Sequence, residues 1–182
     1  MKIIETEFVG LCVIQPKVFT DSRGYFFESY RHDIFLKAGI SFLPVQDNES
    51  KSVMGVIRGL HYQLKPFDQA KLIRVVVGKV LDVAVDLRRD SPTFGKWFGI
   101  ELDSENKNQL FIPRGFAHGF SVLSDTTIIQ YKCDNVYNPK YECGISLADP
   151  ELNIDWKLGK VKPIISDKDL RHPNLRDAEN NF

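Results

Sequence analysis

Short apolar stretches separated by turn residues run along most of the chain. They are rich in β-branched and aromatic residues, as in LCVIQPKVFT (residues 11–20), GVIRGLHYQL (55–64) and TTIIQYKCDNVY (126–137). Turn residues recur roughly every eight to twelve positions, which favours an antiparallel sandwich or barrel. The segment RHDIFLKAG (31–39) predicts about one or two helical turns ending at Gly39. The pattern therefore predicts a mainly β barrel of two sheets with short peripheral helices.

The longest apolar stretch is AKLIRVVVGKVLDVAVDLR, residues 70–88. It predicts two strands joined by a tight hairpin at Gly78-Lys79. Alternation places Val75, Val77, Leu81, Val83 and Val85 on one face and Val76, Val80 and Ala84 on the other. A strand that is apolar on both faces must be covered on both. We expect another sheet or another subunit to supply the second cover, and we predict a homodimer.

Composition and charge limit the possible partners. The chain has 182 residues, with 24 lysines and arginines against 24 aspartates and glutamates. This balance creates no bulk field that would attract nucleic acid or a membrane. The three cysteines match no zinc motif and indicate free thiols in a reducing compartment. We expect one domain over residues 1–182, with N-terminal strands and a C-terminal tail, in the cytoplasm and without nucleic-acid or membrane partners.

The stretch RGLHYQ (58–63) places a cation and an imidazole inside a strand-like segment. His61 has three interpretations: a hydrogen-bonded core residue, a metal ligand or a catalytic base. On a regular strand Arg58 and His61 would face opposite sides, because they are three residues apart. Gly59 permits a bulge that re-aims its neighbours. We predict an irregular backbone over residues 58–60, with both side chains reaching one cavity.

Other polar residues recur where a strand should be apolar. Alone, each is more often a solvated or hydrogen-bonded structural residue. Together, Arg23, Arg58 and Lys71 could form a cationic cluster that binds phosphate. His61 could act as a base if a carboxylate orients it, and Tyr131 could donate a proton from another strand. A lysine near a carbonyl oxygen could stabilise an enolate, so the set suggests proton removal and return beside a ketone.

A metal site is the alternative role for these histidines. Many barrels of this kind bind a transition metal through an HxH pair, a glutamate and a later histidine. Here the second position of the pair is Gln63, and His118 could be the later ligand. Two histidines without the third make a poor site, so we expect no metal.

Eight motifs resemble those of one enzyme family in the same order. They are VFTDSRGYFFESY, VQDNESKS, VIRGLHYQ, AKLIRVVVGKVLDVAVDLRRDSPTFGKW, NQLFIPRGFAHGF, IIQYKCDNVYNPKYECGI, DWKL and ISDKD. The sequence is similar to the dTDP-4-dehydrorhamnose 3,5-epimerases over nearly its whole length. The resemblance implies a cupin-type jelly roll (a double-stranded β-helix), a homodimer, and no metal or organic cofactor. It also implies epimerisation at C3 and C5 of dTDP-4-dehydro-6-deoxy-D-glucose, in dTDP-L-rhamnose biosynthesis.

The resemblance also assigns residues. It implies that His61 is the base, that Asp169 pairs with it, that Tyr131 is the acid on the opposite ring face, and that Lys71 stabilises the enolate. The residues implied to bind the sugar nucleotide are Arg23, Glu28, Gln46, Asp47, Asn48, Arg58, Lys71, His118, Glu142 and Lys168.

Two alternatives stay open beside the double epimerase. One is epimerisation at C3 or C5 alone on a related 4-keto-6-deoxy sugar nucleotide. The other is a non-catalytic protein that binds sugar nucleotides on the same fold. One departure from the family pattern bears on specificity. Val136 stands before Tyr137 where two consecutive aromatic residues are frequent, which puts recognition of the nucleobase in question.

Overall fold

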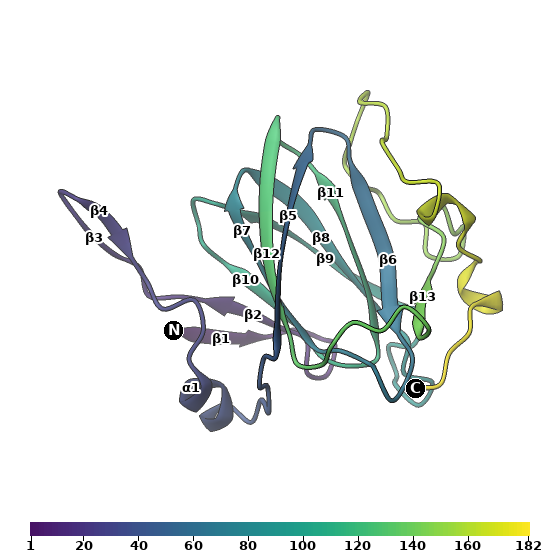
Figure 1. Cartoon of the computed structure of the whole chain (residues 1–182), viewed down its shortest axis with the longest axis horizontal. Helices are drawn as coiled ribbons and strands as arrows, with labels where there is room; N and C mark the ends of the chain where they lie inside the picture. The colour runs from purple at the N-terminus through teal and green to yellow at the C-terminus, as the bar shows by residue number, and fades with distance from the viewer.

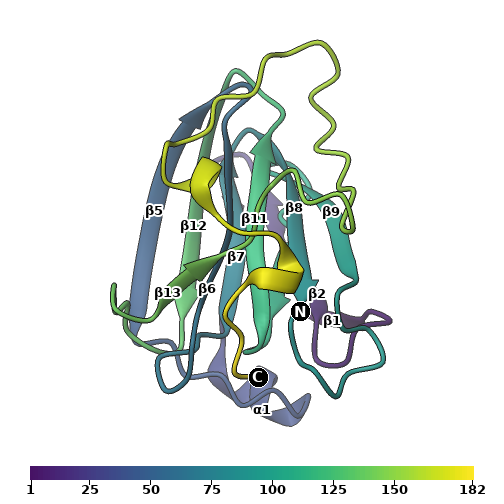
Figure 2. The same cartoon turned by 90° about the vertical axis from the view of Figure 1, so that its right-hand side faces the viewer.

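Two antiparallel sheets face each other and form the body of the molecule (Figures 1 and 2). The computed structural model describes residues 1–182. In spatial order, the six-stranded sheet contains β1 (Lys2–Glu5), β2 (Cys12–Gln15), β10 (Gln109–Ile112), β7 (Lys71–Val77), β12 (Thr126–Cys133) and β5 (Gln46–Val53). The five-stranded sheet contains β13 (Glu142–Gly144), β6 (Ile57–Gln63), β11 (Phe116–Val122), β8 (Lys79–Asp86) and β9 (Trp97–Asp103).

The helical elements are short and lie outside the sheets, as the sequence predicts. The α-helix α1 (His32–Lys37) is followed by Gly39 at a φ of +78°, which confirms the expected end. Two 3₁₀ turns, η1 (Asp169–Arg171) and η2 (Leu175–Asp177), lie in the C-terminal segment. The prediction of a mainly β, jelly-roll fold is confirmed. No helix has both the length and the apolar character needed to cross a membrane.

The predicted hairpin at Gly78-Lys79 is wrong. β7 pairs with β10 and β12, whereas β8 pairs with β11 and β9, so the two strands belong to different sheets. Gly78, at a φ of +82°, turns the chain from one sheet into the other. A Cβ atom there would overlap Ser124 and the carbonyl of Thr126. The glycine therefore makes a packed corner rather than a hairpin turn.

This corner also changes which residues share a face. Val75 packs with Val80 and Ala84 between the sheets, while Leu81, Val83 and Val85 face a second cluster, and Val77 is exposed. The alternation predicted across Gly78 is therefore wrong, because the corner breaks the two-residue period. The second cluster is closed by the chain's own C-terminal segment through Leu147, Leu152, Trp156, Leu175 and Phe182. Burial of both faces of β8 therefore needs no second subunit.

A hairpin of β3 (Phe19–Asp21) and β4 (Gly24–Phe26) projects from the body as an arm (Figure 1). Its aromatic side chains are more than half exposed: Phe19 is 52% exposed, Tyr25 58% and Phe26 66%. Three partly exposed aromatic side chains therefore gather on this arm.

The packed corner at Gly78 predicts that a glycine-to-alanine substitution lowers the free energy of unfolding more there than at Gly39. We expect Gly78→Ala to lower the free energy of unfolding by at least about 3 kcal/mol, because strain at positive φ adds to a steric overlap. Gly39→Ala is the matched control: its φ is +78° but the space around it is open, so we expect a loss of about 1–2 kcal/mol. Unfolding in urea measures both values, and equal losses would contradict the packed corner.

Candidate active site

The site begins at the irregular part of β6. Gly59 has a φ of +131°, and a Cβ atom there would lie 2.5 Å from the Cα atom of Gly119 on β11. The β6–β11 register shifts between His118 and Phe120, so the ladder is interrupted opposite this glycine. Arg58 and His61 consequently line one cavity of about 430 Å³, together with residues of the C-terminal segment. The predicted irregular backbone is confirmed.

His61 forms a hydrogen bond with Asp169 at the start of η1. The distance from Nε2 of His61 to Oδ1 of Asp169 is 2.9 Å. The second carboxylate oxygen accepts the backbone N–H of Gly59 at 3.3 Å, and the N–H of Asp169 donates to Oγ of Ser166 at 3.1 Å. Asp169 is buried, with 5% of its side chain exposed, against 31% for His61. Because Nε2 is engaged, Nδ1 is the nitrogen left to exchange a proton.

Electrostatics favours a neutral imidazole beside an ionised carboxylate. Burial lowers the pKa of His61, the hydrogen bond and the charge of Asp169 oppose this, and Lys71 adds to the lowering. Burial alone would raise the pKa of Asp169, but the hydrogen bonds from His61 and Gly59 outweigh it and the pKa lies below its ordinary value. At neutral pH the pair is therefore in the form that can accept a proton.

A second cavity, of about 230 Å³, adjoins His61 inside the barrel mouth. Its lining brings together residues that the sequence assigned to one site: Gln46, Asn48, His61, Lys71, Tyr131 and Glu142. Burial raises the pKa of Tyr131, so its hydroxyl stays protonated, and burial lowers the pKa of Lys71. The cavity thus joins a base, a protonated phenol and a lysine on β6, β12 and β7.

The rim of this cavity carries an ion pair and one tyrosine that the sequence analysis did not assign to the site. Lys168 forms an ion pair with Glu142 at 2.6 Å, which places both at the site. Tyr137 also lines the cavity, and its hydroxyl donates to Glu142 at 2.5 Å. The backbone N–H of Tyr137 donates to the side chain of Gln46 at 2.8 Å. The signal for Tyr137 was present, since it ends the stretch that contains Tyr131.

Other residues assigned in the sequence lie away from the cavity. Asp47 points to the outer face of the six-stranded sheet and pairs with Lys132 at 2.8 Å, because neighbouring residues of β5 alternate. His118 is opposite His61 in the ladder but is buried against Asp82 at 3.0 Å. Arg23 pairs with Asp21 on the arm, and Glu28 pairs with Arg31 near its base. Within this chain these four residues do not line the cavity.

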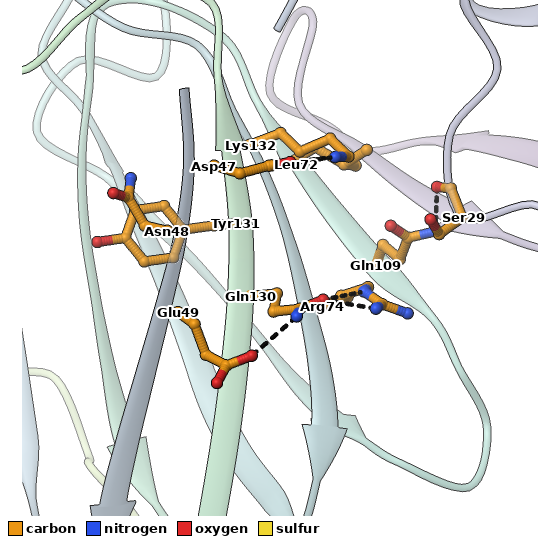
Figure 3. Close-up of a pocket in the computed structure, with 10 residues that line it drawn as sticks. All are labelled: Ser29, Asp47, Asn48, Glu49, Leu72, Arg74, Gln109, Gln130, Tyr131 and Lys132. Atoms are coloured by element: carbon orange, nitrogen blue, oxygen red, sulfur yellow. Dashed lines mark hydrogen bonds and ion pairs between the residues drawn. The ribbon is translucent and has the colours of Figure 1, made fainter. Parts of the chain in front are cut away.

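The outer face holds a polar cavity of about 210 Å³ (Figure 3). Gln130 accepts a hydrogen bond from Arg74 and donates one to Glu49 at 2.8 Å. In Figure 3 Tyr131 and Asn48 point to one side of the β5–β12 pair, while Lys132 and Gln130 extend to the other. The side chains on one face of the β5–β12 pair therefore point toward the barrel cavity, and those on the other face point toward the outer face of the sheet.

The amide of Gln63 has a structural role. Its Nε2 donates to the carbonyl of Phe67 at 2.7 Å, and its Oε1 accepts the N–H of Asn138 at 2.6 Å. Gln63 is buried and ties two loops together at the position where a second histidine would complete an HxH pair.

Comparison with known proteins shows the family of the chain. Residues 5–177 match the family model described as dTDP-4-dehydrorhamnose 3,5-epimerase. The chain belongs to the dTDP-4-dehydrorhamnose 3,5-epimerase family. A family member from Shigella flexneri is 51% identical over 180 residues, which cover 98% of each chain.

Two solved structures of the family superpose closely. The 3,5-epimerase of Elizabethkingia anophelis has a TM-score of 0.94 and 48% identity, with 100% of this chain and 99% of the other covered. The RmlC epimerase of Legionella pneumophila, solved with dTDP-4-keto-L-rhamnose, has a TM-score of 0.93 and 47% identity, covering 97% and 93%. The present chain is therefore an isomerase on the family fold.

The pKa of His61 tests the arrangement of the pair. We expect NMR titration of its ring to give a pKa below 6.5, because burial disfavours the imidazolium. Asp169→Asn should lower it further, because that variant removes the charge that favours the protonated ring. Asp103→Asn, at the end of β9, is the matched control and should leave the value unchanged. A pKa that rises in Asp169→Asn would contradict the pairing.

Proposed function

We propose that this protein epimerises C3 and C5 of dTDP-4-dehydro-6-deoxy-D-glucose, giving dTDP-4-dehydro-L-rhamnose in dTDP-L-rhamnose biosynthesis. The observation that carries this proposal is the hydrogen-bonded pair of His61 and Asp169 beside a cavity that Tyr131 and Lys71 also line. A protein that only bound a sugar nucleotide would have no need for a buried imidazole–carboxylate pair opposite a protonated phenol.

The proton transfers follow from the side chains. Nδ1 of His61 takes the proton from the carbon beside the C4 ketone, and the electron pair moves onto the C4 oxygen as an enolate. Asp169 stabilises the resulting imidazolium, and the base supplies roughly 10²–10⁴-fold in rate. Lys71 donates to the enolate oxygen, a contribution of about 3 kcal/mol for one such donor. Tyr131 then returns a proton to the opposite face of the carbon, which inverts it.

The same chemistry needs no metal or organic cofactor, because side chains carry every proton and Lys71 takes the place of a Lewis acid. Arg58 and Lys168 supply positive charge at the rim for the diphosphate. Gln46, Asn48 and Glu142 supply hydrogen-bonding groups for the sugar. Tyr137, half exposed at the mouth, offers a ring on which the nucleobase can stack, in spite of Val136.

We further propose that residues 1–182 act as one domain, because the C-terminal segment both closes the barrel and supplies Asp169.

Deuterium incorporation tests the reaction. Incubation with dTDP-4-dehydro-6-deoxy-D-glucose in D₂O should place deuterium at C3 and C5 of the product. His61→Ala should abolish exchange, while Tyr131→Phe should keep part of the exchange and lose inversion. Matched controls are His32→Ala on α1 and Tyr141→Phe, whose ring packs on Phe67. Deuterium at one carbon alone would indicate a mono-epimerase, and no exchange would indicate a binding protein.

We also propose that the enzyme is a homodimer in which each arm reaches the partner's site. The exposed aromatic side chains of β3 and β4 require cover, and Arg23 lies at the tip of that arm. The base of the arm adjoins the polar outer face, where Gln109 donates to the carbonyl of Ser29 at 2.8 Å. An exchanged arm would let Arg23 and Glu28 bind nucleotide at the partner's cavity, although they lie away from their own.

Hybrid dimers test this arrangement. Arg23→Ala and His61→Ala chains should each be nearly inactive alone. In a co-expressed hybrid, purified through two different tags, one site combines an intact His61 with an intact Arg23 from the other chain. That hybrid should regain about half of the wild-type activity per dimer. No recovery would place Arg23 in its own chain's site, and a 20.9 kDa monomer in light scattering would exclude the dimer.

A further inference from the structure

A second histidine lies against the catalytic pair. His172 follows η1, and its ring meets His61 edge to face, with 5.5 Å between ring centroids and 89° between planes. The polar edge of the His172 ring sits over Gly144, where a Cβ atom would overlap it. Gly144 is the ladder partner of His61 across β13 and β6. The glycine therefore leaves the space in which His172 is seated beside His61.

These residues form a cluster of metal-ligand type. One ligand atom from each of His61, Asp169 and His172 can be chosen so that all three lie within 4.8 Å of one another. Nδ1 of His172 is buried and has no hydrogen-bond partner. The carboxylate of Asp169 is also fixed from behind by the N–H of Gly59, the kind of support that metal-ligating carboxylates have. An imidazole nitrogen without a partner beside two ligand groups is a feature that the epimerase reaction leaves unused.

We propose that His61, Asp169 and His172 bind Zn²⁺ and that the bound ion inhibits the enzyme. Two nitrogens and one carboxylate oxygen suit Zn²⁺, which takes four ligands and leaves the fourth position here to water. Ligand atoms on one tetrahedral ion are about 3.3 Å apart, so the His172 ring must move inward to close the site. Mg²⁺ prefers an all-oxygen octahedral shell and does not fit this donor set.

The inhibition follows from the tautomer of His61, and this part rests on the proposed function. Zn²⁺ bound at Nε2 replaces the hydrogen bond to Asp169 and keeps the single ring proton of the neutral imidazole on Nδ1. Nδ1 is the nitrogen that must accept the substrate proton, so the base is blocked without any redox step. Because the ion sits on the side away from the substrate, it should lower kcat and leave KM nearly unchanged.

Calorimetry with ZnCl₂ and no substrate tests the site directly. Metal-free wild-type protein should bind one Zn²⁺ per chain through this cluster. We expect His172→Gln to weaken binding at least about tenfold, since even outer-shell partners account for 10–100-fold in affinity. His32→Gln on α1 and Cys143→Ser, the thiol next to Gly144, are matched controls and should bind as the wild type does. Gly144→Ala, which displaces the ring but keeps every ligand residue, should also weaken binding.

The result that overturns the proposal is equal Zn²⁺ affinity in wild type, His172→Gln and Gly144→Ala, or no binding by the wild type. Exchange assays supply the second readout. Zn²⁺ should reduce kcat of the wild type, with activity restored by EDTA, and should inhibit His172→Gln only at correspondingly higher concentration. A rise in KM alone would indicate Zn²⁺ bound to the substrate diphosphate and would contradict inhibition at this site. Inactivity of the metal-free enzyme would refute the proposed function, while calorimetry would still decide the site.

Discussion

The hydrogen bond between His61 and Asp169 connects two parts of the chain that are 108 residues apart. A buried carboxylate costs several kcal/mol unless other groups satisfy it. Here the imidazole and the N–H of Gly59 provide that compensation, while Ser166 accepts the backbone N–H of Asp169. The C-terminal segment that carries Asp169 also closes the apolar face of β8. Folding of this segment and formation of the His61–Asp169 pair are therefore one event: a chain that failed to bury its C-terminal apolar residues would also lose the partner of His61.

Backbone packing explains how His61 reaches its position. A regular β6 would send Arg58 and His61 to opposite faces. Gly59 and Gly119 let β6 and β11 approach so closely that no side chain fits between them, and the ladder shifts at that point. The site thus depends on residues without side chains as much as on those that carry the chemistry. Gly144 extends the same principle to the ring of His172.

The sequence was sufficient for some of these features and insufficient for others. Period-two alternation and turn residues predicted the strands, and the glycine in RGLHYQ predicted the break in β6. Alternation failed at Gly78 because a residue pattern does not reveal when the chain passes to another sheet. Alternation also could not decide whether Asp47 or Asn48 points into the cavity, because the inward face of β5 depends on its pairing with β12. Motif resemblance placed Arg23 in the site, but only the three-dimensional structure shows that Arg23 does not line the cavity of its own chain.

The alternation on β5 and β12 has a consequence for the whole enzyme. Asn48 and Tyr131 point into the cavity, while their sequence neighbours Asp47 and Lys132 form an ion pair on the outer face. Neighbouring residues of a strand share one backbone, so any shift of this strand pair moves both surfaces together. If the outer face and the arm are covered by a second subunit, as proposed, association fixes the strands that hold the acid. The dimer then contributes to catalysis in two ways: it supplies Arg23 from the partner's arm, and it holds the position of Tyr131 relative to His61.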